Sequence, residues 1–400
     1  MKLNRLFLVS AALLSSACGA SLECSEDNNC FLNEAGTALC ESGHQWLDPD
    51  AADDYRCEPI PEVKSPVSEF GTNLSLSFEL VANSSAGLAI PRDLEFHPDR
   101  PDELWIINQE TQSMTILHKP NTPDQRSEVR IDAFADHFMA VPSSLAFGAL
   151  NTFATCQESR NDMRGYQQPD DFMGPTLWPA DLDIFAMVNQ TPFGNLLGSH
   201  LDMNHQSPLC MGIAHQQDNE YWVFDGFNGH VVFYDFNQDH GPGRDDHSDA
   251  QIRRYPEASL TRVEGIPGHM EVDHATGWLY VADTGAGRVI RLDTKSGTFN
   301  RDLFSWSQNE PLAEFSEYTG AAVETIISDL VNPSGLAISG DTLFISDNAT
   351  GEIIGYDKNT GIELDRISTP AKSISGLTIG PEGELWFVDM AEEKVFHVSP

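Results

Sequence analysis

Short apolar runs that end in an acidic or amide residue recur along most of the chain. Five of these runs are rich in aromatic residues and end in Asp or Asn, and they occupy residues 103–108, 220–225, 278–283, 342–347 and 384–389. A sixth and weaker copy occupies residues 151–156. Runs of this length that are rich in Val, Ile, Tyr, Phe and Trp are typical of β-strands. The pattern therefore predicts an all-β fold.

Another apolar strand precedes most of these runs and often begins with proline, as in Pro91-Arg-Asp-Leu, Pro142-Ser-Ser-Leu and Pro333-Ser-Gly-Leu. The intervals between the repeats are uneven, whereas a solenoid requires a strict period and propeller blades tolerate long loops. Six blades of four short antiparallel strands account for the repeats. We therefore predict a six-bladed β-propeller over residues 73–400.

The sixth blade has only three strands in the repeat pattern. An alternating strand that belongs to no repeat, Leu74-Ser-Leu-Ser-Phe-Glu-Leu80, lies just before the first blade. We expect the strand at 73–80 to be the fourth strand of the last blade, because it would cover an otherwise open sheet edge.

The repeats resemble those of the NHL family of six-bladed β-propellers, most clearly at Leu279-Tyr-Val-Ala-Asp-Thr-Gly-Ala-Gly-Arg-Val289. The resemblance covers roughly residues 85–400 and implies the fold. It implies much less about activity, because propellers of this type include enzymes, ligand-binding proteins and scaffolds.

The charge of the chain excludes one class of partner. It has 23 Lys and Arg against 61 Asp and Glu, which gives a net charge of −38. Such a surface repels phosphate backbones, so we expect no nucleic-acid partner. With 40% hydrophobic residues the chain can bury a large core.

The first residues have the features of an export signal. Lys2 and Arg5 precede an apolar stretch that is too short to span a membrane and ends near Cys18. We predict a signal peptide at 1–17. Its end resembles a bacterial lipobox, which implies lipidation of Cys18 and no other membrane contact. The expected location is the bacterial outer membrane or cell surface; ordinary cleavage would instead leave a periplasmic or secreted protein.

A polar, cysteine-rich segment follows at 18–60 and contains Cys24, Cys30, Cys40 and Cys57. An even number of cysteines in an exported chain predicts disulfides, but their pairing stays open. Cys40-Glu-Ser-Gly43 together with Cys57 resembles the last loop of an EGF-like module. A Pro-containing linker is expected at 61–72.

Two further cysteines, Cys156 and Cys210, fall at matching places in the predicted second and third blades. We predict a disulfide between them. The competing interpretation is a reactive thiol or a copper ligand close to Met211 and His205.

Polar residues mark the ends of the predicted second strands and the starts of the first strands. Antiparallel pairing would bring both sets to one face of the disc. The strand-end set is Asn108, Cys156, Asp225, Asp283, Asp347 and Asp389. The strand-start set is Asp93, Ser144, Cys210, His269, Ser334 and Ser375. We predict a ligand-binding face made of Asn108, Asp225, His269, Asp283, Asp347, Asp389 and His205. The structural alternative is that each Asp accepts N–H groups of its own turn.

An acidic loop at 235–249 carries oxygen ligands at regular spacing. Asp235, Asn237 and Asp239 match the first three positions of an EF-hand-type calcium loop, and Asp246 matches the twelfth. His240 occupies the position where Gly is required. We predict a calcium site here, with a solvated acidic loop as the alternative.

A long segment at 157–207 carries His200 and His205 and is predicted to cover one face as a lid. These features favour a monomeric binding module for a small-molecule or protein ligand, with no catalytic residue assigned. The alternative is a metal-dependent hydrolase or lyase. In the resemblance to amidating lyases only His269 matches a zinc ligand, and in the resemblance to gluconolactonases the required Glu is not identifiable.

Overall fold

The computed structural model describes Phe70 and residues 76–160, 172–187, 196–244, 246–304 and 311–399, together with four short strands nearer the N-terminus. The chain divides into two compact units, residues 1–63 and 64–400. In the first unit β1 (Cys30–Leu32) pairs with β2 (Ala38–Cys40), and β3 (His44–Trp46) pairs with β4 (Cys57–Pro59). The predicted signal peptide, Cys18, the cysteine pairing and most of the linker lie outside the described residues.

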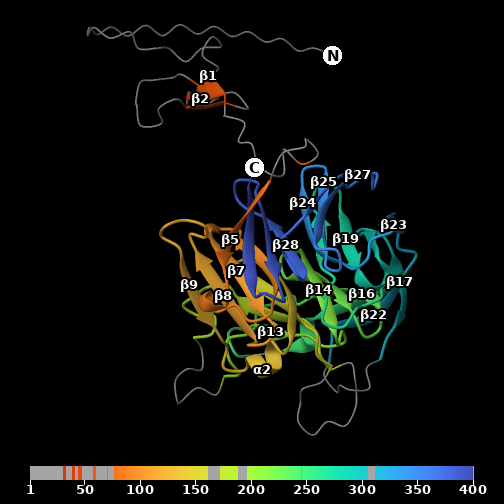
Figure 1. Cartoon of the computed structure of the whole chain (residues 1–400). Coiled ribbons are helices and arrows are strands. Elements are labelled where there is room, and N and C mark those ends of the chain that lie inside the picture. Colours follow the sequence, from red (N-terminus) through yellow and green to blue (C-terminus); the bar gives the residue numbers. More distant parts are fainter. Residues whose placement is uncertain are drawn as a thin grey trace, which may run out of the picture. The chain divides into compact units, whose positions relative to one another are not determined.

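The second unit is a six-bladed β-propeller, as predicted (Figure 1). The first three blades consist of β6 (Pro91–His97), β7 (Arg100–Asn108), β8 (Ser113–His118) and β9 (Arg126–Arg130); β10 (Pro142–Phe147), β11 (Thr152–Gln157), β12 (Thr176–Pro179) and β13 (Asp202–Met203); and β14 (Cys210–Gln217), β15 (Glu220–Asp225), β16 (His230–Asp235) and β17 (Gln251–Ser259). The other three consist of β18 (Met270–Asp273), β19 (Trp278–Asp283), β20 (Arg288–Asp293) and β23 (Val323–Ile327); β24 (Pro333–Ser339), β25 (Thr342–Asp347), β26 (Glu352–Asp357) and β27 (Glu363–Ser368); and β28 (Ile374–Ile379), β29 (Leu385–Asp389), β30 (Lys394–Ser399) and β5 (Ser77–Ala82).

The described helices are short: α2 (Ala135–Phe138) and the 3₁₀ turns η2 (Ser84–Ala86), η3 (His247–Asp249) and η4 (Thr284–Ala286). None of them approaches the length and apolar character that a membrane-crossing helix needs.

The core lies between neighbouring blades, which explains why the second strands are apolar on both faces. Trp105 and Trp222 on these strands are almost fully buried. One cluster joins the sixth blade to the first through Trp386, Ile106 and Leu94. Outer strands such as β27 face solvent on one side and alternate between exposed and half-buried residues.

The ring is closed by β5, which is antiparallel to β30 and forms the outer strand of the last blade. The orange β5 lies beside the blue C-terminal strands in Figure 1. This strand begins at Ser77, a few residues later than the expected strand at 73–80. Phe78 packs edge-on against Phe387, with ring centroids 6.2 Å apart.

A segment that the sequence analysis predicted to be a lid supplies blade strands. The segment 157–207 contains β12 and β13, the outer strands of the second blade, so the prediction of a separate lid was wrong. A hairpin of β21 (Thr298–Asp302) and β22 (Glu314–Thr319) extends the third blade, because β22 pairs parallel with β17. These strands lack the aromatic pattern and were therefore not recognised.

Candidate functional site

The first strands of the blades surround the propeller axis in the order β6, β10, β14, β18, β24 and β28. In a ring of six, β6 lies opposite β18. In each blade an apolar residue of the first strand pairs with the second strand, and the residue just before it lies at the same level along the propeller axis as its counterparts in the other blades. We call this the Asp93 level. The residues at this level are Asp93, Ser144, Gly212, His269, Gly335 and Gly376.

Three glycines occupy this level where the sequence analysis expected Cys210, Ser334 and Ser375. The pairing shifts register at the start of each of these strands, which moves the polar residue away from the expected position. A Cβ atom at Gly212 would lie 2.1 Å from the carbonyl oxygen of Gly268, and one at Gly376 would lie 2.6 Å from Cα of Asp93. The strands therefore approach closely here, and only Asp93, Ser144 and His269 bear polar side chains.

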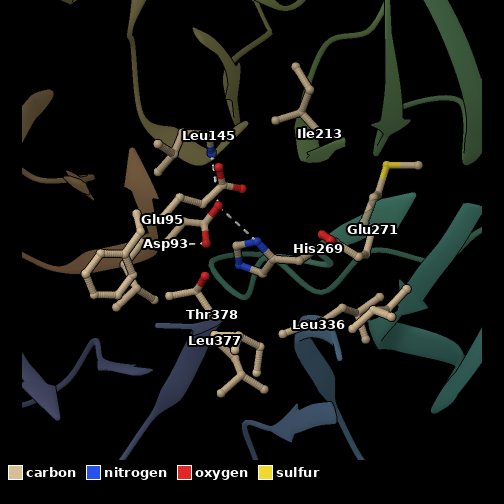
Figure 2. A pocket seen from close by; sticks show the side chains of 15 residues that line it. Asp93, Glu95, Leu145, Ile213, His269, Glu271, Leu336, Leu377 and Thr378 are labelled. Carbon is tan, nitrogen blue, oxygen red and sulfur yellow. Dashed lines mark hydrogen bonds and ion pairs between the residues drawn. The ribbon is translucent and has the colours of Figure 1, made fainter. Parts of the chain in front are cut away.

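Asp93 and His269 meet across the propeller axis. Oδ2 of Asp93 lies 3.2 Å from Nδ1 of His269 (Figure 2). The carboxylate is fixed by the backbone N–H of Leu94, which donates to Oδ1 at 2.9 Å, and by that of Leu145, which donates to Oδ2 at 3.0 Å. Nε2 of His269 is buried and has no hydrogen-bond partner among the described residues. An imidazole whose Nδ1–H donates to a carboxylate presents Nε2 as a free acceptor.

This pair lies in the wall of a central cavity of about 290 Å³. The volume is at the lower end of small-molecule sites, which occupy roughly 300–1,000 Å³. Figure 2 shows Asp93 and Glu95 next to the ring of His269, Glu271 on the other side of that ring, and apolar side chains around them. The apolar part of the wall includes Leu145, Ile213, Leu336 and Leu377.

Glu95 and Glu271 follow Asp93 and His269 by two residues on the same strands and also line the cavity. Burial, and then repulsion from Asp93 and Glu271, raises the pKa of Glu95 well above its ordinary value. Burial, and then repulsion from Asp93 and Asp273, raises the pKa of Glu271 to about 8. The backbone N–H of Phe147 donates to Glu95 at 3.1 Å. Because Glu271 holds a proton near neutral pH, the cavity can take up or release a proton.

The cavity opens toward the ends of the inner strands. A second cavity of about 150 Å³ shares Glu95 and Glu271 with the first and is also lined by His215 and His274. Asp93 and His269 are each 5% exposed. The solvent exposure of the residues rises from the start toward the end of the inner strands, and His274 is exposed. A ligand would therefore enter past His215 and His274.

Buried ion pairs cover the opposite end of the channel. Arg92 donates to Glu158 at 2.8 Å and Arg262 donates to the other carboxylate oxygen at 2.7 Å. The N–H of Gly265 also donates to Glu158, at 3.0 Å. Nη2 of Arg92 reaches the carbonyl oxygen of Gly265 at 3.4 Å, across the ring from the first blade to the loop before the fourth.

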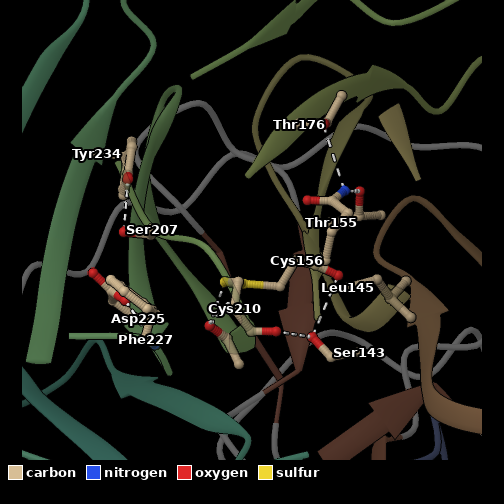
Figure 3. Close-up of a disulfide and its surroundings, with 12 residues drawn as sticks. Ser143, Leu145, Thr155, Cys156, Thr176, Ser207, Cys210, Asp225, Phe227 and Tyr234 are labelled. Atoms are coloured by element: carbon tan, nitrogen blue, oxygen red, sulfur yellow. Dashed lines mark hydrogen bonds between the residues drawn. A yellow bond between two sulfur atoms is a disulfide. The ribbon is translucent and has the colours of Figure 1, made fainter. Parts of the chain in front are cut away.

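The predicted disulfide between Cys156 and Cys210 is confirmed (Figure 3). Its Cα atoms are 5.2 Å apart and 54 residues separate the two cysteines in sequence. The bond joins β11 of the second blade to β14 of the third. Ser143 supports the junction, because its Oγ donates to the carbonyl oxygen of Cys210 at 2.7 Å. Both cysteines are therefore structural.

The acidic strand ends stabilise turns and do not line the cavity. Asp347 accepts N–H groups from Val331, Asn332, Ala349 and Thr350, and Asp389 accepts from Lys372, Ser373, Ala391 and Glu392. Asp225 binds Arg254 at 2.5 Å, and Asp283 binds Arg288 at 2.8 Å. Asn108 accepts from Ala89 at 3.0 Å. In the second blade the equivalent residue is Gln157, one residue beyond Cys156. Of the predicted ligand-binding face, the structure brings only His269 into the cavity lining.

His205 also lies away from the cavity lining. Its Nδ1 contacts the carbonyl oxygen of Phe172, and its ring centroid is 4.9 Å from that of His247. This position, beside the outer strands of the second blade, follows from the incorporation of the 157–207 segment into that blade.

The side chains predicted to bind calcium make local turn contacts. Asp235 accepts from N–H of Asn237 at 2.8 Å, Asp239 accepts from Gly241 at 2.6 Å, and Asp246 accepts from Ser248 at 3.1 Å. Among the residues with described side chains, no three His, Cys, Asp or Glu are grouped to hold a metal. Calcium binding by this loop stays a prediction.

Replacing Glu271 by Gln is expected to change how stability depends on pH. The folded protein holds a proton on Glu271 that the unfolded chain releases above 4.5, so the free energy of unfolding falls as pH rises from 4.5 to about 8. One pKa unit corresponds to about 1.4 kcal/mol, and water in the cavity reduces the effect, so we expect Glu271→Gln to gain on the order of 2 kcal/mol at pH 8.5 and little at pH 4.5. Urea unfolding at both pH values measures it.

The exposed Glu110→Gln is the matched control for that experiment. It should leave stability unchanged at both pH values, because surface substitutions have small effects. An equal stability change for Glu271→Gln at the two pH values would contradict the expected protonation of Glu271.

No family model matches the sequence, and no curated protein matches it. Solved structures do match. A structure described as an auxiliary nutrient binding protein from Bacteroides ovatus ATCC 8483 has a TM-score of 0.51 at 8% identity, over 82% of this chain and 77% of that one. Another so described, from Bacteroides thetaiotaomicron VPI-5482, has a TM-score of 0.50 at 9% identity, over 88% and 81%. A streptogramin B lyase has a TM-score of 0.46 at 12% identity, over 81% and 97%. The likeness to the two nutrient binding structures shows a shared fold.

Proposed function

We propose that this propeller binds a small molecule in its central cavity. The main support for the proposal is the environment of the two ring nitrogens of His269. Asp93 fixes its ring from the opposite strand, and its buried Nε2 faces no partner among the described residues. A buried acceptor without a hydrogen bond costs free energy, which a ligand donor in the cavity would recover. Two of the similar propellers are described as nutrient binding proteins, a related kind of activity.

The test uses three small aromatic probes of similar shape: benzylammonium, benzyl alcohol and benzoate. Thr378 lines the cavity and is half-buried, so Thr378→Trp should fill the space. We expect at least one probe to bind the wild type in saturation-transfer NMR and to lose binding in Thr378→Trp. Failure of all three probes to bind, or binding that Thr378→Trp leaves unchanged, would overturn the proposal.

A second candidate is acid–base catalysis by a lyase or hydrolase. It is favoured by the pairing of Asp93 with His269 beside a protonated Glu271, since enzymes place titratable groups in contrasting environments to act as base and acid. His269 would accept a proton at Nε2 and Glu271 would donate one. The metal that such enzymes use has no three-ligand site among the described side chains, so no step is assigned to a metal.

We also propose a cellular location for the protein. The buried Cys156–Cys210 disulfide fits an oxidising compartment, and the lipobox-like sequence before Cys18 would place the protein in the cell envelope through a lipid anchor. Partition of the mature protein into detergent, lost in Cys18→Ala, tests the anchor. NHL-type membership and a monomeric state complete the description that we propose.

A further inference from the structure

Most polar side chains in the wall of the central cavity are carboxyls or an imidazole, and Thr378 adds one hydroxyl. Nε2 of His269 is buried and has no hydrogen-bond partner among the described residues, the side chain of His269 is 6% exposed, and Glu95 and Glu271 add two carboxyls. Among the described residues no side chain donates a hydrogen bond to Glu271, and only the backbone N–H of Phe147 donates to Glu95. Once Glu95 and Glu271 are ionised, their oxygens have few donors among the described residues, and a ligand would have to supply the others.

The charges around these acids are also one-sided. Neither cavity is lined by Lys or Arg among the described residues. The titratable groups that face Glu95 and Glu271 are Asp93, Asp273, His269, His215, His274 and Tyr221. Arg92 lies beyond the Asp93 level, where Glu158 already neutralises it. A cation in the cavity would thus meet carboxyls with no competing positive charge other than a protonated histidine.

The apolar part of the cavity wall indicates which kind of cation would bind. Leu145, Ile213, Leu336 and Leu377 face the same space, together with Met270. Hard divalent ions take six to eight oxygen ligands, or keep several waters, and gain nothing from such a wall. An ammonium group carries three N–H donors, and an attached apolar body would bury its surface against these side chains.

We propose that the ligand is a small primary amine with an apolar body, whose ammonium group donates to Glu95, Glu271 and Nε2 of His269. This inference rests on the proposed binding function and specifies the class of ligand. The amine enters past His215 and His274, since ion pairs of Arg92, Glu158 and Arg262 cover the other end. Its charge favours ionised carboxylates, so binding near neutral pH releases a proton from Glu271 to solvent.

The experiment is calorimetry with benzylammonium at pH 7.5 in two buffers of different ionisation enthalpy. We expect binding with net proton release, and at least tenfold weaker binding of benzyl alcohol and benzoate. Glu271→Gln and Glu95→Gln should each weaken benzylammonium binding at least tenfold, whereas Glu110→Gln, an exposed acid, should leave it unchanged. Glu271→Gln is expected to fold, and its far-ultraviolet circular dichroism and melting curve verify this.

Several results would overturn the inference while leaving a binding function intact. One is binding of benzyl alcohol or benzoate at least as tight as that of benzylammonium. Another is benzylammonium binding that both Gln variants retain, which would place the amine elsewhere. A third is binding of Ca²⁺ or Mg²⁺ that is lost in Glu271→Gln when benzylammonium does not bind. Absence of binding by all probes would instead contradict the proposed function itself.

Discussion

Deletion of residues 76–82 is expected to abolish cooperative folding of the propeller. These residues include β5, the outer strand of the last blade, whose pairing with β30 joins the start of the described propeller to its end. Without β5 the backbone of β30 becomes an open sheet edge, and the face of the blade that Phe78 covers is exposed. Loss of a whole strand ladder from a protein whose total stability is about 5–15 kcal/mol leaves little margin.

Urea unfolding followed by tryptophan fluorescence measures the effect, since Trp105, Trp178 and Trp222 are buried. The matched control removes residues 22–63, which belong to the other compact unit, and keeps β5. The control should unfold cooperatively with a midpoint close to that of the full chain. A cooperative transition of normal amplitude in the β5 deletion would show that the ring does not need this strand.

The sequence predicts the ring well because the second strands are apolar on both faces. Runs such as 220–225 and 384–389 are packed between neighbouring sheets, so their pattern is imposed by the core and can be recognised without any alignment. The outer strands have no such requirement. β13 has two residues and β21 is exposed along its length, and for this reason neither strand was recognised in the sequence.

The site was predicted less well, for two physical reasons. Turn-stabilising and ligand-binding carboxylates look alike in sequence, and Asp347 and Asp389 proved to hold backbone N–H groups. Register shifts at the strand starts also concealed which residues surround the axis. An acid two residues after Asp93 and another two after His269 are the signal that could have revealed Glu95 and Glu271, because alternate residues of a strand share a face.

Replacement of Glu158 by Ala is expected to lower the free energy of unfolding by about 3–5 kcal/mol, the range for removing one partner of a buried ion pair. Arg92 is 3% exposed, and burial lowers its pKa while Glu158 opposes that shift. The substitution leaves this guanidinium without its carboxylate and also frees Arg262 and the N–H of Gly265. Urea unfolding at pH 7 measures the loss.

Glu264→Ala is the matched control, because Glu264 is an exposed acid in the same loop as Arg262 and Gly265. It should change stability by no more than about 0.5 kcal/mol. The double variant Arg92→Met, Glu158→Met should recover the part of the loss that comes from the unpaired Arg92, while Arg262 and the N–H of Gly265 stay without their acceptor. If Glu158→Ala is as stable as Glu264→Ala, these ion pairs do not hold the end of the channel closed. If it is much less stable, the ion pairs of Glu158 hold this end of the channel together.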